Sequence, residues 1–96
     1  MSLSVFATIR PKLECLDEAR TLILGIMADT RAEEGCQHFT LHENAEGERL
    51  HLTEIWADQA AFDNHHAQPY TRAVFKKYEQ LLAVPVELTF MQPVEQ

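Results

Sequence analysis

Residues 31–70 read RAEEGCQHFTLHENAEGERLHLTEIWADQAAFDNHHAQPY, and this stretch decides the order of the elements. A helix before it is predicted to stop at Gly35, because glycine readily adopts the left-handed conformation that closes a helix. Two strands follow, the second ending in Glu54-Ile55-Trp56, and Asp58 suits the N-cap of the next helix. The sequence therefore predicts a Trp, a carboxylate and a His pair near one strand-to-helix junction.

The two central strands are predicted over Cys36–Glu43 and Arg49–Trp56, with a turn at residues 44–48 between them. Phe39 is predicted to face Leu52, and Leu41 to face Leu50. One face would then carry Phe39, Leu41, Leu50, Leu52, Glu54 and Trp56, and the other Cys36, His38, Thr40, His42, His51, Thr53 and Ile55. A one-residue slip would mix these two sets, so the apolar pattern favours this sorting of faces.

The flanking segments supply the outer elements of the fold. Val5 to Arg10 alternate and predict a strand, and apolar residues at three- and four-residue steps predict one helix from Leu13 to Arg31. Pro69 suits the first turn of a helix ending near Ala83. A last strand would carry Val86, Leu88 and Phe90.

The predicted order is β-α-β-β-α-α-β over a single domain, residues 1–96. It builds a ferredoxin-like α+β fold, with an antiparallel sheet covered by helices on one face. The uncovered face would carry Ile55 and other apolar groups, and the sheet of a second subunit is its natural cover. We therefore expect a homodimer in which two sheets close into a shared α+β barrel.

Composition and charge narrow the classes of function. The net charge of −7 argues against nucleic acid as a partner, because phosphate binding needs a basic surface. No apolar run is long enough to cross a membrane, and we expect a cytoplasmic protein. The one basic cluster, Arg72, Lys76 and Lys77, is either a solvated helix face or an anion-attracting rim. Cys15 and Cys36 lack zinc spacing and are predicted to be free thiols.

The ordered residues resemble the antibiotic biosynthesis monooxygenase family of dimeric α+β-barrel proteins. The resemblance rests on residues 30–36, 39–42 and 54–62, with His65 and Pro69, and it extends over nearly the whole chain. It implies a dimer whose subunits each hold a pocket between the sheet and the helices. Members of the family oxygenate quinols or polyketide-like phenols without flavin or metal, process a phosphorylated sugar derivative, or degrade haem.

The haem-degrading branch of the family places an Asn on the first strand, a Trp on the third and a His on the last helix. Trp56 matches that Trp. Residues 5–10 contain no Asn, and residues 70–82 contain no His. The resemblance therefore does not favour haem degradation.

Three residues near the junction are candidates for chemistry. His65 matches the family's His position and is either a general base that takes a proton from a phenol, or a capping or packing residue. Glu54 either handles protons or is paired with an Arg or a helix N-terminus. Trp56 would anchor the core, stack on a planar substrate, or do both. His66 is predicted to face solvent.

The remaining candidates line the predicted pocket. Tyr70 either donates a hydrogen bond to a substrate oxygen at the pocket mouth or simply packs on the sheet. Phe39, Leu41, Leu52, Val74 and Phe90 are expected in the core, and all of these except Phe90 are candidate substrate contacts. We expect no metal site, because His38 and His42 would lie about 13 Å apart along their strand. Together with His51 they are expected to form a polar, pH-sensitive patch at the dimer interface.

Three functions follow from these residues. The first is a cofactor-independent monooxygenase acting on a small quinol or phenol, with dioxygen as second substrate. The second is an oxygen-independent isomerase of a small phosphorylated carbonyl compound. The third is a non-catalytic module that binds a small ligand during stress. The chain has no Gly-rich phosphate loop and no flavin or nicotinamide fingerprint, and we expect no cofactor.

Overall fold

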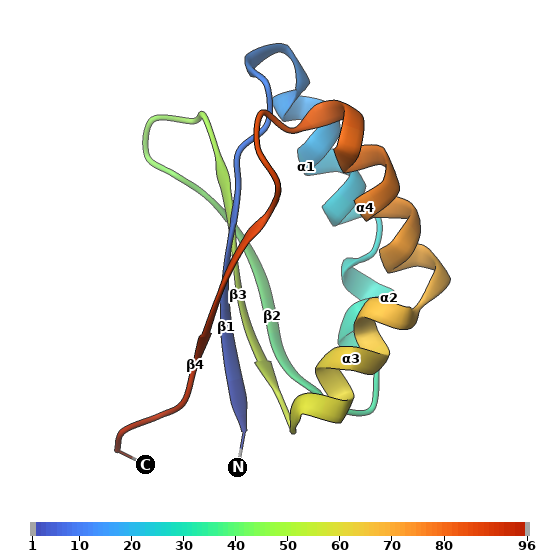
Figure 1. The fold of residues 1–96 in the computed structure, drawn as a ribbon, viewed down its shortest axis with the longest axis vertical. Helices are drawn as coiled ribbons and strands as arrows, with labels where there is room; N and C mark the ends of the chain where they lie inside the picture. The colour runs from blue at the N-terminus through green and yellow to red at the C-terminus, as the bar shows by residue number, and fades with distance from the viewer. Residues whose placement is uncertain (1, 96) are drawn as a thin grey trace.

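Four strands form one antiparallel sheet, and all the helices lie against one of its faces (Figure 1). The structure, a computed structural model, describes residues 2–95. The strand order is β2-β3-β1-β4. The elements are β1 (Leu3–Ile9), a short 3₁₀ turn η1 (Leu13–Cys15), α1 (Leu16–Leu24), α2 (Met27–Arg31), β2 (Cys36–Glu43), β3 (Leu50–Trp56), α3 (Gln59–Ala67), α4 (Pro69–Leu81) and β4 (Glu87–Met91). The predicted ferredoxin-like α+β fold is confirmed.

The first helical segment is broken, so the prediction of a single helix from Leu13 to Arg31 was wrong. The chain forms η1, α1 and α2, with the break at Gly25 and Ile26. Glycine is a poor helix former, and the break turns the chain so that α1 packs on α4 while α2 packs on β2. Ile26 is buried in this arrangement, whereas Leu13 is 84% exposed and does not belong to the apolar stripe.

The hairpin pairs two residues away from the predicted register. Phe39 pairs with Glu54, and Leu41 pairs with Leu52. The loop between the strands is residues 44–49 and is therefore longer than the predicted 44–48. The side-chain oxygen of Asn44 accepts hydrogen bonds at 2.9 and 2.8 Å from the last two backbone N–H groups of this loop. Because a shift by two residues keeps each side chain on its face, the apolar residues still point toward the helices.

A β-bulge at the start of β2 changes the position of one cysteine. Cys36 pairs with Trp56, whereas His38 pairs with Ile55, so Gln37 is the extra residue. Cys36 was predicted on the uncovered face. The bulge instead places it on the helix-covered face, where it packs against the core.

Gly35 serves a close approach and not a left-handed helix stop, so that prediction was wrong. Within the described residues the glycine with a positive φ is Gly47, at 69° in the hairpin loop. A Cβ at Gly35 would lie 2.2 Å from the Cβ of Ala61, and the carbonyl of Gly35 accepts a 2.8 Å hydrogen bond from the backbone of Ala57. The start of β2 is therefore pressed directly onto α3.

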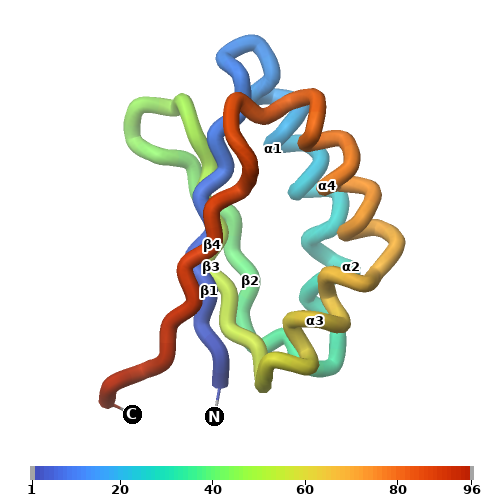
Figure 2. Tube along the Cα trace, viewed as in Figure 1, coloured from blue at the N-terminus to red at the C-terminus, as the bar shows by residue number. Residues whose placement is uncertain are grey.

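The core lies between the sheet and the helices. Val5, Ala7 and Ile9 of the central strand β1 are each 1% exposed, and they pack beneath α1 and α4. Phe90, predicted in the core, is 50% exposed near the end of β4. β4 is an edge strand, and Phe90 keeps one contact with the helix layer, edge-on to Phe62 of α3 with ring centroids 5.3 Å apart. Beyond β4 the chain bends away from the helices (Figure 2).

Candidate functional site

A narrow cavity lies between the sheet and the helices, where the pocket was predicted. Its volume is about 20 Å³, room for roughly one water molecule. Its walls are mostly apolar, and its polar lining residues are Glu54, His65, His66, Thr71 and Tyr78. A cavity with apolar walls and a few convergent polar groups is the usual form of a small-molecule site.

Glu54 brings a buried carboxyl group to this cavity from β3. It is 5% exposed, and Trp56 Nε1 donates a 2.9 Å hydrogen bond to its Oε1. Burial raises the pKa of Glu54 to about 7, against a smaller lowering by the Trp56 hydrogen bond. Both protonation states are therefore accessible near neutral pH, as proton transfer requires. The hydrogen-bond partner of the Glu54 carboxyl is therefore the indole N–H of Trp56, and not an Arg or a helix N-terminus as the pairing alternative predicted.

His65 reaches the same cavity from α3. Its Nδ1 lies 2.8 Å from Oε2 of Glu33, and its side chain is 4% exposed. Its ring stacks on Trp56, with centroids 4.8 Å apart and an interplanar angle of 30°. The edge of Phe39 packs against it at 5.5 Å. These contacts fix both the plane and the direction of the imidazole.

Tyr70 contacts the carboxylate of Glu33, a partner that the sequence did not predict. Its hydroxyl donates to Oε2 of Glu33, and its distance to the carbonyl of Asp29 is 3.4 Å. Burial and the neighbouring Glu33 raise the pKa of Tyr70 well above its usual range, so the phenol stays protonated and donates. The other carboxylate oxygen, Oε1 of Glu33, is buried without a hydrogen-bond partner among residues 2–95.

His66 faces inward and not toward solvent, contrary to prediction. Its ring packs 4.4 Å from Phe62 and 5.2 Å from Phe75, because α4 covers this side of α3. Burial, followed by the neighbouring His65, lowers the pKa of His66 to about 4. The ring is therefore neutral at pH 7.

The structure gathers most of the predicted site residues around the cavity. Those that line it are His65, Glu54, Phe39, Leu52 and Val74. Trp56 lies behind His65 and is fully buried, so its stacked face is occupied by an imidazole. Leu41 lies elsewhere, in an outer hollow beside Arg20 and Met27.

The sequence prediction missed Glu33, which contacts His65, and three polar residues of the cavity lining, His66, Thr71 and Tyr78. Glu33 sits in the quoted stretch beside Glu34, and nothing in the sequence separates the two carboxylates. The one available signal is position: Glu33 lies three residues before Cys36, which pairs with Trp56 at the site end of the sheet.

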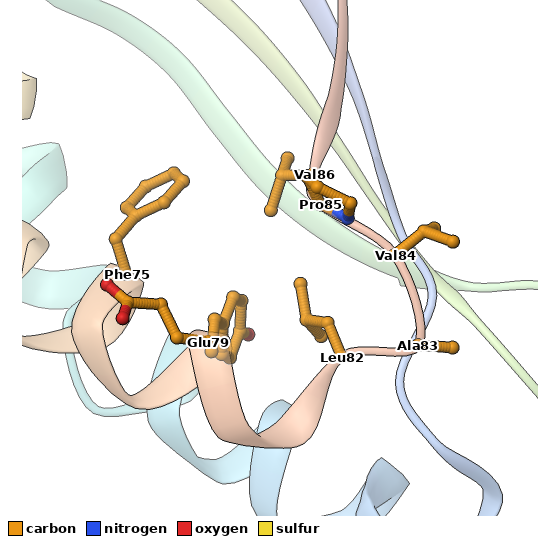
Figure 3. Close-up of a pocket in the computed structure, with 8 residues that line it drawn as sticks. Phe75, Glu79, Leu82, Ala83, Val84, Pro85 and Val86 are labelled. Carbon is orange, nitrogen blue, oxygen red and sulfur yellow. The ribbon is translucent and has the colours of Figure 1, made fainter.

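A larger hollow adjoins the cavity, between α4 and the segment that leads into β4. Its volume is about 500 Å³, and Figure 3 shows Phe75 of α4 facing Val86 across it. Phe75, Tyr78 and Val86 line both this groove and the inner cavity. These three side chains therefore border both the groove and the cavity that His65 and Glu54 line.

The histidines of the uncovered sheet face bond to threonines. His38 Nε2 lies 3.0 Å from Thr53 Oγ1, and His42 Nε2 lies 3.4 Å from the same oxygen. Within residues 2–95, no group of three or more His, Cys, Asp or Glu side chains is placed to hold a metal ion. Across the same residues, no helix is long and apolar enough to span a membrane.

The fold and the lined cavity define an α+β protein with a small, mostly apolar cavity between its sheet and its helices, and comparison with known proteins supplies the family. The family model described as antibiotic biosynthesis monooxygenase matches residues 2–77. The chain belongs to this family, as its residues had suggested.

A protein of Mycobacterium tuberculosis named "Putative monooxygenase Rv0793" is 30% identical over 93 residues, which are 97% of this chain and 92% of the relative. The solved structure of Rv0793 has a TM-score of 0.95 at 29% identity and covers 100% of this chain and 98% of its own. PA3566 of Pseudomonas aeruginosa has a TM-score of 0.91 at 23% identity, over 98% of this chain and 95% of its own, and shares the fold. The family and its named relative support a monooxygenase-like function.

Proposed function

We propose that the protein is a cofactor-independent monooxygenase that oxidises a small quinol or phenol in the cavity between sheet and helices. One observation carries the proposal: an imidazole and a carboxyl group, His65 and Glu54, line the same apolar cavity. Burial raises the pKa of the Glu54 carboxyl to about 7, so this group can both accept and donate a proton near neutral pH. His65 is the proposed base and Glu54 the second proton carrier.

The proposed reaction begins with proton transfer. His65 takes a hydroxyl proton from the hydroquinone, and the resulting anion gives one electron to dioxygen. The substrate radical and superoxide then combine at a ring carbon to form a peroxide. One oxygen atom stays on the ring and the other leaves as water, so hydroquinone plus dioxygen gives hydroxyquinone plus water. Atoms and electrons balance with no external reductant, and Glu54 supplies a proton to the departing oxygen.

Substrate entry requires the cavity to open. Its volume of about 20 Å³ is far below the roughly 300–1,000 Å³ typical of small-molecule sites. Phe75 is 38% exposed, so its ring has space to rotate. Movement of Phe75 away from Val86 would join the cavity to the groove of about 500 Å³ beside it. The groove is the proposed route of the substrate.

The proposed active form is a homodimer that covers the open face of the sheet. That face carries Phe6 and Ile55 among its threonines and histidines, and Met91 at its edge is 43% exposed. Burying such residues against a second copy would stabilise a domain of this size. Sedimentation of wild type and Ile55→Lys tests the assembly: wild type should sediment as a dimer, and the variant as a folded monomer.

The basic residues argue against the isomerase alternative. Arg72 and Lys76 line a hollow on the outer side of α4, whereas the cavity lining contains neither Lys nor Arg among the described residues. A phosphorylated substrate bound beside His65 would lack the cation that such a group requires.

Oxygen-dependent turnover of a hydroquinone panel tests the proposed function. The purified protein should consume one dioxygen per hydroxyquinone formed and should be inactive without oxygen. His65→Gln should abolish this activity, whereas Glu18→Gln, a change at an exposed position of α1, should preserve it. Binding without turnover across the panel would refute the proposal and favour a ligand-binding module.

A further inference from the structure

Glu33 sets a buried carboxylate against one nitrogen of His65. The side chains are 7% and 4% exposed, and Glu33 Oε2 lies 2.8 Å from His65 Nδ1. The hydroxyl of Tyr70 donates to the same oxygen. Because an ionised carboxylate can only accept hydrogen bonds, the nitrogen that faces it must carry a hydrogen.

The backbone around Glu33 is held against the helix that carries His65. The N–H of Cys36 donates to the carbonyl of Glu33 at 3.0 Å, which closes a turn just before β2. Within that turn, Gly35 packs so closely on α3 that a Cβ would lie 2.2 Å from Ala61. The carboxylate and the imidazole therefore belong to one tightly packed unit, with little freedom to separate.

The opposite nitrogen of His65 has no such partner. Within residues 2–95, no hydrogen bond involves Nε2, while the ring itself lines the cavity. Stacking on Trp56 holds the ring in plane. We propose that Glu33 is a positioning residue that fixes the Nδ1–H tautomer of His65 and so presents a bare Nε2 to the substrate. A second group that fixes the tautomer in this way is a general means of preparing a histidine for proton transfer.

The inference rests on the proposed function for its purpose, but the tautomer itself is measurable without turnover. After His65 takes a proton at Nε2, the carboxylate of Glu33 faces the new positive charge. A purely structural Glu33 would instead only tie the end of α2 to α3 and α4. Its loss would then lower stability and leave the tautomer of His65 unchanged.

Nitrogen NMR of ¹⁵N-histidine-labelled full-length protein tests the assignment. Spectra are recorded above the ordinary titration range of imidazole, and the His65 signals are identified by their loss in His65→Gln. Wild type should show hydrogen on Nδ1 and a bare Nε2. Glu33→Gln should show mixed tautomers, because an amide can either accept from Nδ1–H or donate to Nδ1.

Tyr70→Phe is the matched control, since it removes the other donor to Glu33 and leaves the carboxylate in place. It should keep the wild-type tautomer. A bare Nδ1 in wild type, an unchanged tautomer in Glu33→Gln, or an equal change in Tyr70→Phe would each overturn the inference.

Kinetics then link the tautomer to the reaction. Glu33→Gln should lower kcat about 100-fold with little change in KM, the lower end of what a positioned base contributes, and Glu33→Asp should recover part of it. An altered tautomer with an unchanged kcat would overturn the positioning role. Lack of turnover in wild type would refute the proposed function while leaving the NMR result to decide the tautomer.

Discussion

Trp56 joins the two proposed proton carriers, because it donates its indole N–H to Glu54 and stacks its ring on His65. Trp56→Phe would leave Oε1 of Glu54 buried without this donor, a loss of about 1–3 kcal/mol in the free energy of unfolding beyond the change in packing. The hydrogen bond favours the ionised carboxyl and lowers its pKa. The loss should therefore be larger at pH 8 than at pH 5, as measured by urea unfolding.

Leu50→Val is the control for this variant. Leu50 is also buried on β3, but it has no hydrogen bond to an acid and does not line the cavity that holds Glu54 and His66. Its cost should be the same at both pH values. A pH-independent cost in Trp56→Phe would contradict the role assigned to the indole N–H.

Among the individual site residues, the sequence predicted those that a single strand-to-helix junction brings together. Glu54 and Trp56 alternate on one strand, so they share a face, and His65 follows two helical turns after the N-cap Asp58. Glu33 was not predictable, because its approach to His65 depends on the helix break and on the bulge of β2. His66 was missed because its burial comes from α4, which no local pattern on α3 reveals.

Among the elements, the contact between β2 and α3 holds the site together. Gly35→Ala would bring a Cβ within 2.2 Å of Ala61, so strand and helix must move apart. Overpacking of this kind costs about 1–3 kcal/mol. Thermal and urea unfolding should show this loss, and because Glu33 sits in the same turn, the His65 signals should shift as well.

Two variants control for the change at Gly35. Gly25→Ala adds the same methyl group where its nearest atoms lie 3.5 Å away, at an ordinary helical φ of −68°. It should gain about 0.4–1 kcal/mol through the unfolded state. Ala61→Gly should restore the stability lost in Gly35→Ala. If the double variant with both Gly35→Ala and Ala61→Gly is no more stable than Gly35→Ala alone, the clash between these two residues is not the cause of the lost stability.

The packing of α4 against the segment that leads into β4 is expected to control access to the cavity. Phe75→Ala should open the groove onto the cavity, and the readout is Trp56, the only Trp of the chain and 0% exposed. Acrylamide should quench its fluorescence more efficiently in Phe75→Ala than in wild type. Val84 lines the groove but not the cavity, so the control variant Val84→Ala should leave quenching unchanged. Equal quenching in all three proteins would remove Phe75 as the gate.

The order of elements followed from the sequence because apolar periodicity differs between helices and strands. The sequence did not predict where the helical segment breaks, at Gly25 and Ile26. A glycine inside a helical pattern is compatible with either a continuous helix or a break, and packing at Ile26 decides between them. The hairpin register was set by hydrogen bonds of Asn44, and a two-residue shift leaves the apolar pattern of both strands unchanged.

For the whole molecule, two buried groups give stability opposite dependences on pH. The pKa of Glu54 is raised from 4.5 to about 7, so its contribution is present at low pH and is lost as pH rises through that range. The pKa of His66 is lowered from 6.5 to about 4, so its contribution is present at high pH and is lost as pH falls. The pH ranges over which Glu54 and His66 change stability overlap between pH 4.5 and 6.5, and there the two groups change the free energy of unfolding in opposite directions.

Single variants should separate the two slopes. Urea unfolding from pH 4 to 8 should show that Glu54→Gln loses stability more steeply than wild type as pH falls below 6.5, because His66 then acts unopposed. His66→Gln should lose stability more steeply as pH rises from 4.5 to 7, by an amount on the order of 3 kcal/mol from Glu54. Glu18→Gln, an exposed carboxylate on α1, should run parallel to wild type. Parallel curves for all four proteins would show that neither group titrates differently in the folded and unfolded chain. Glu54 would then lose the raised pKa on which its role as a proton carrier depends.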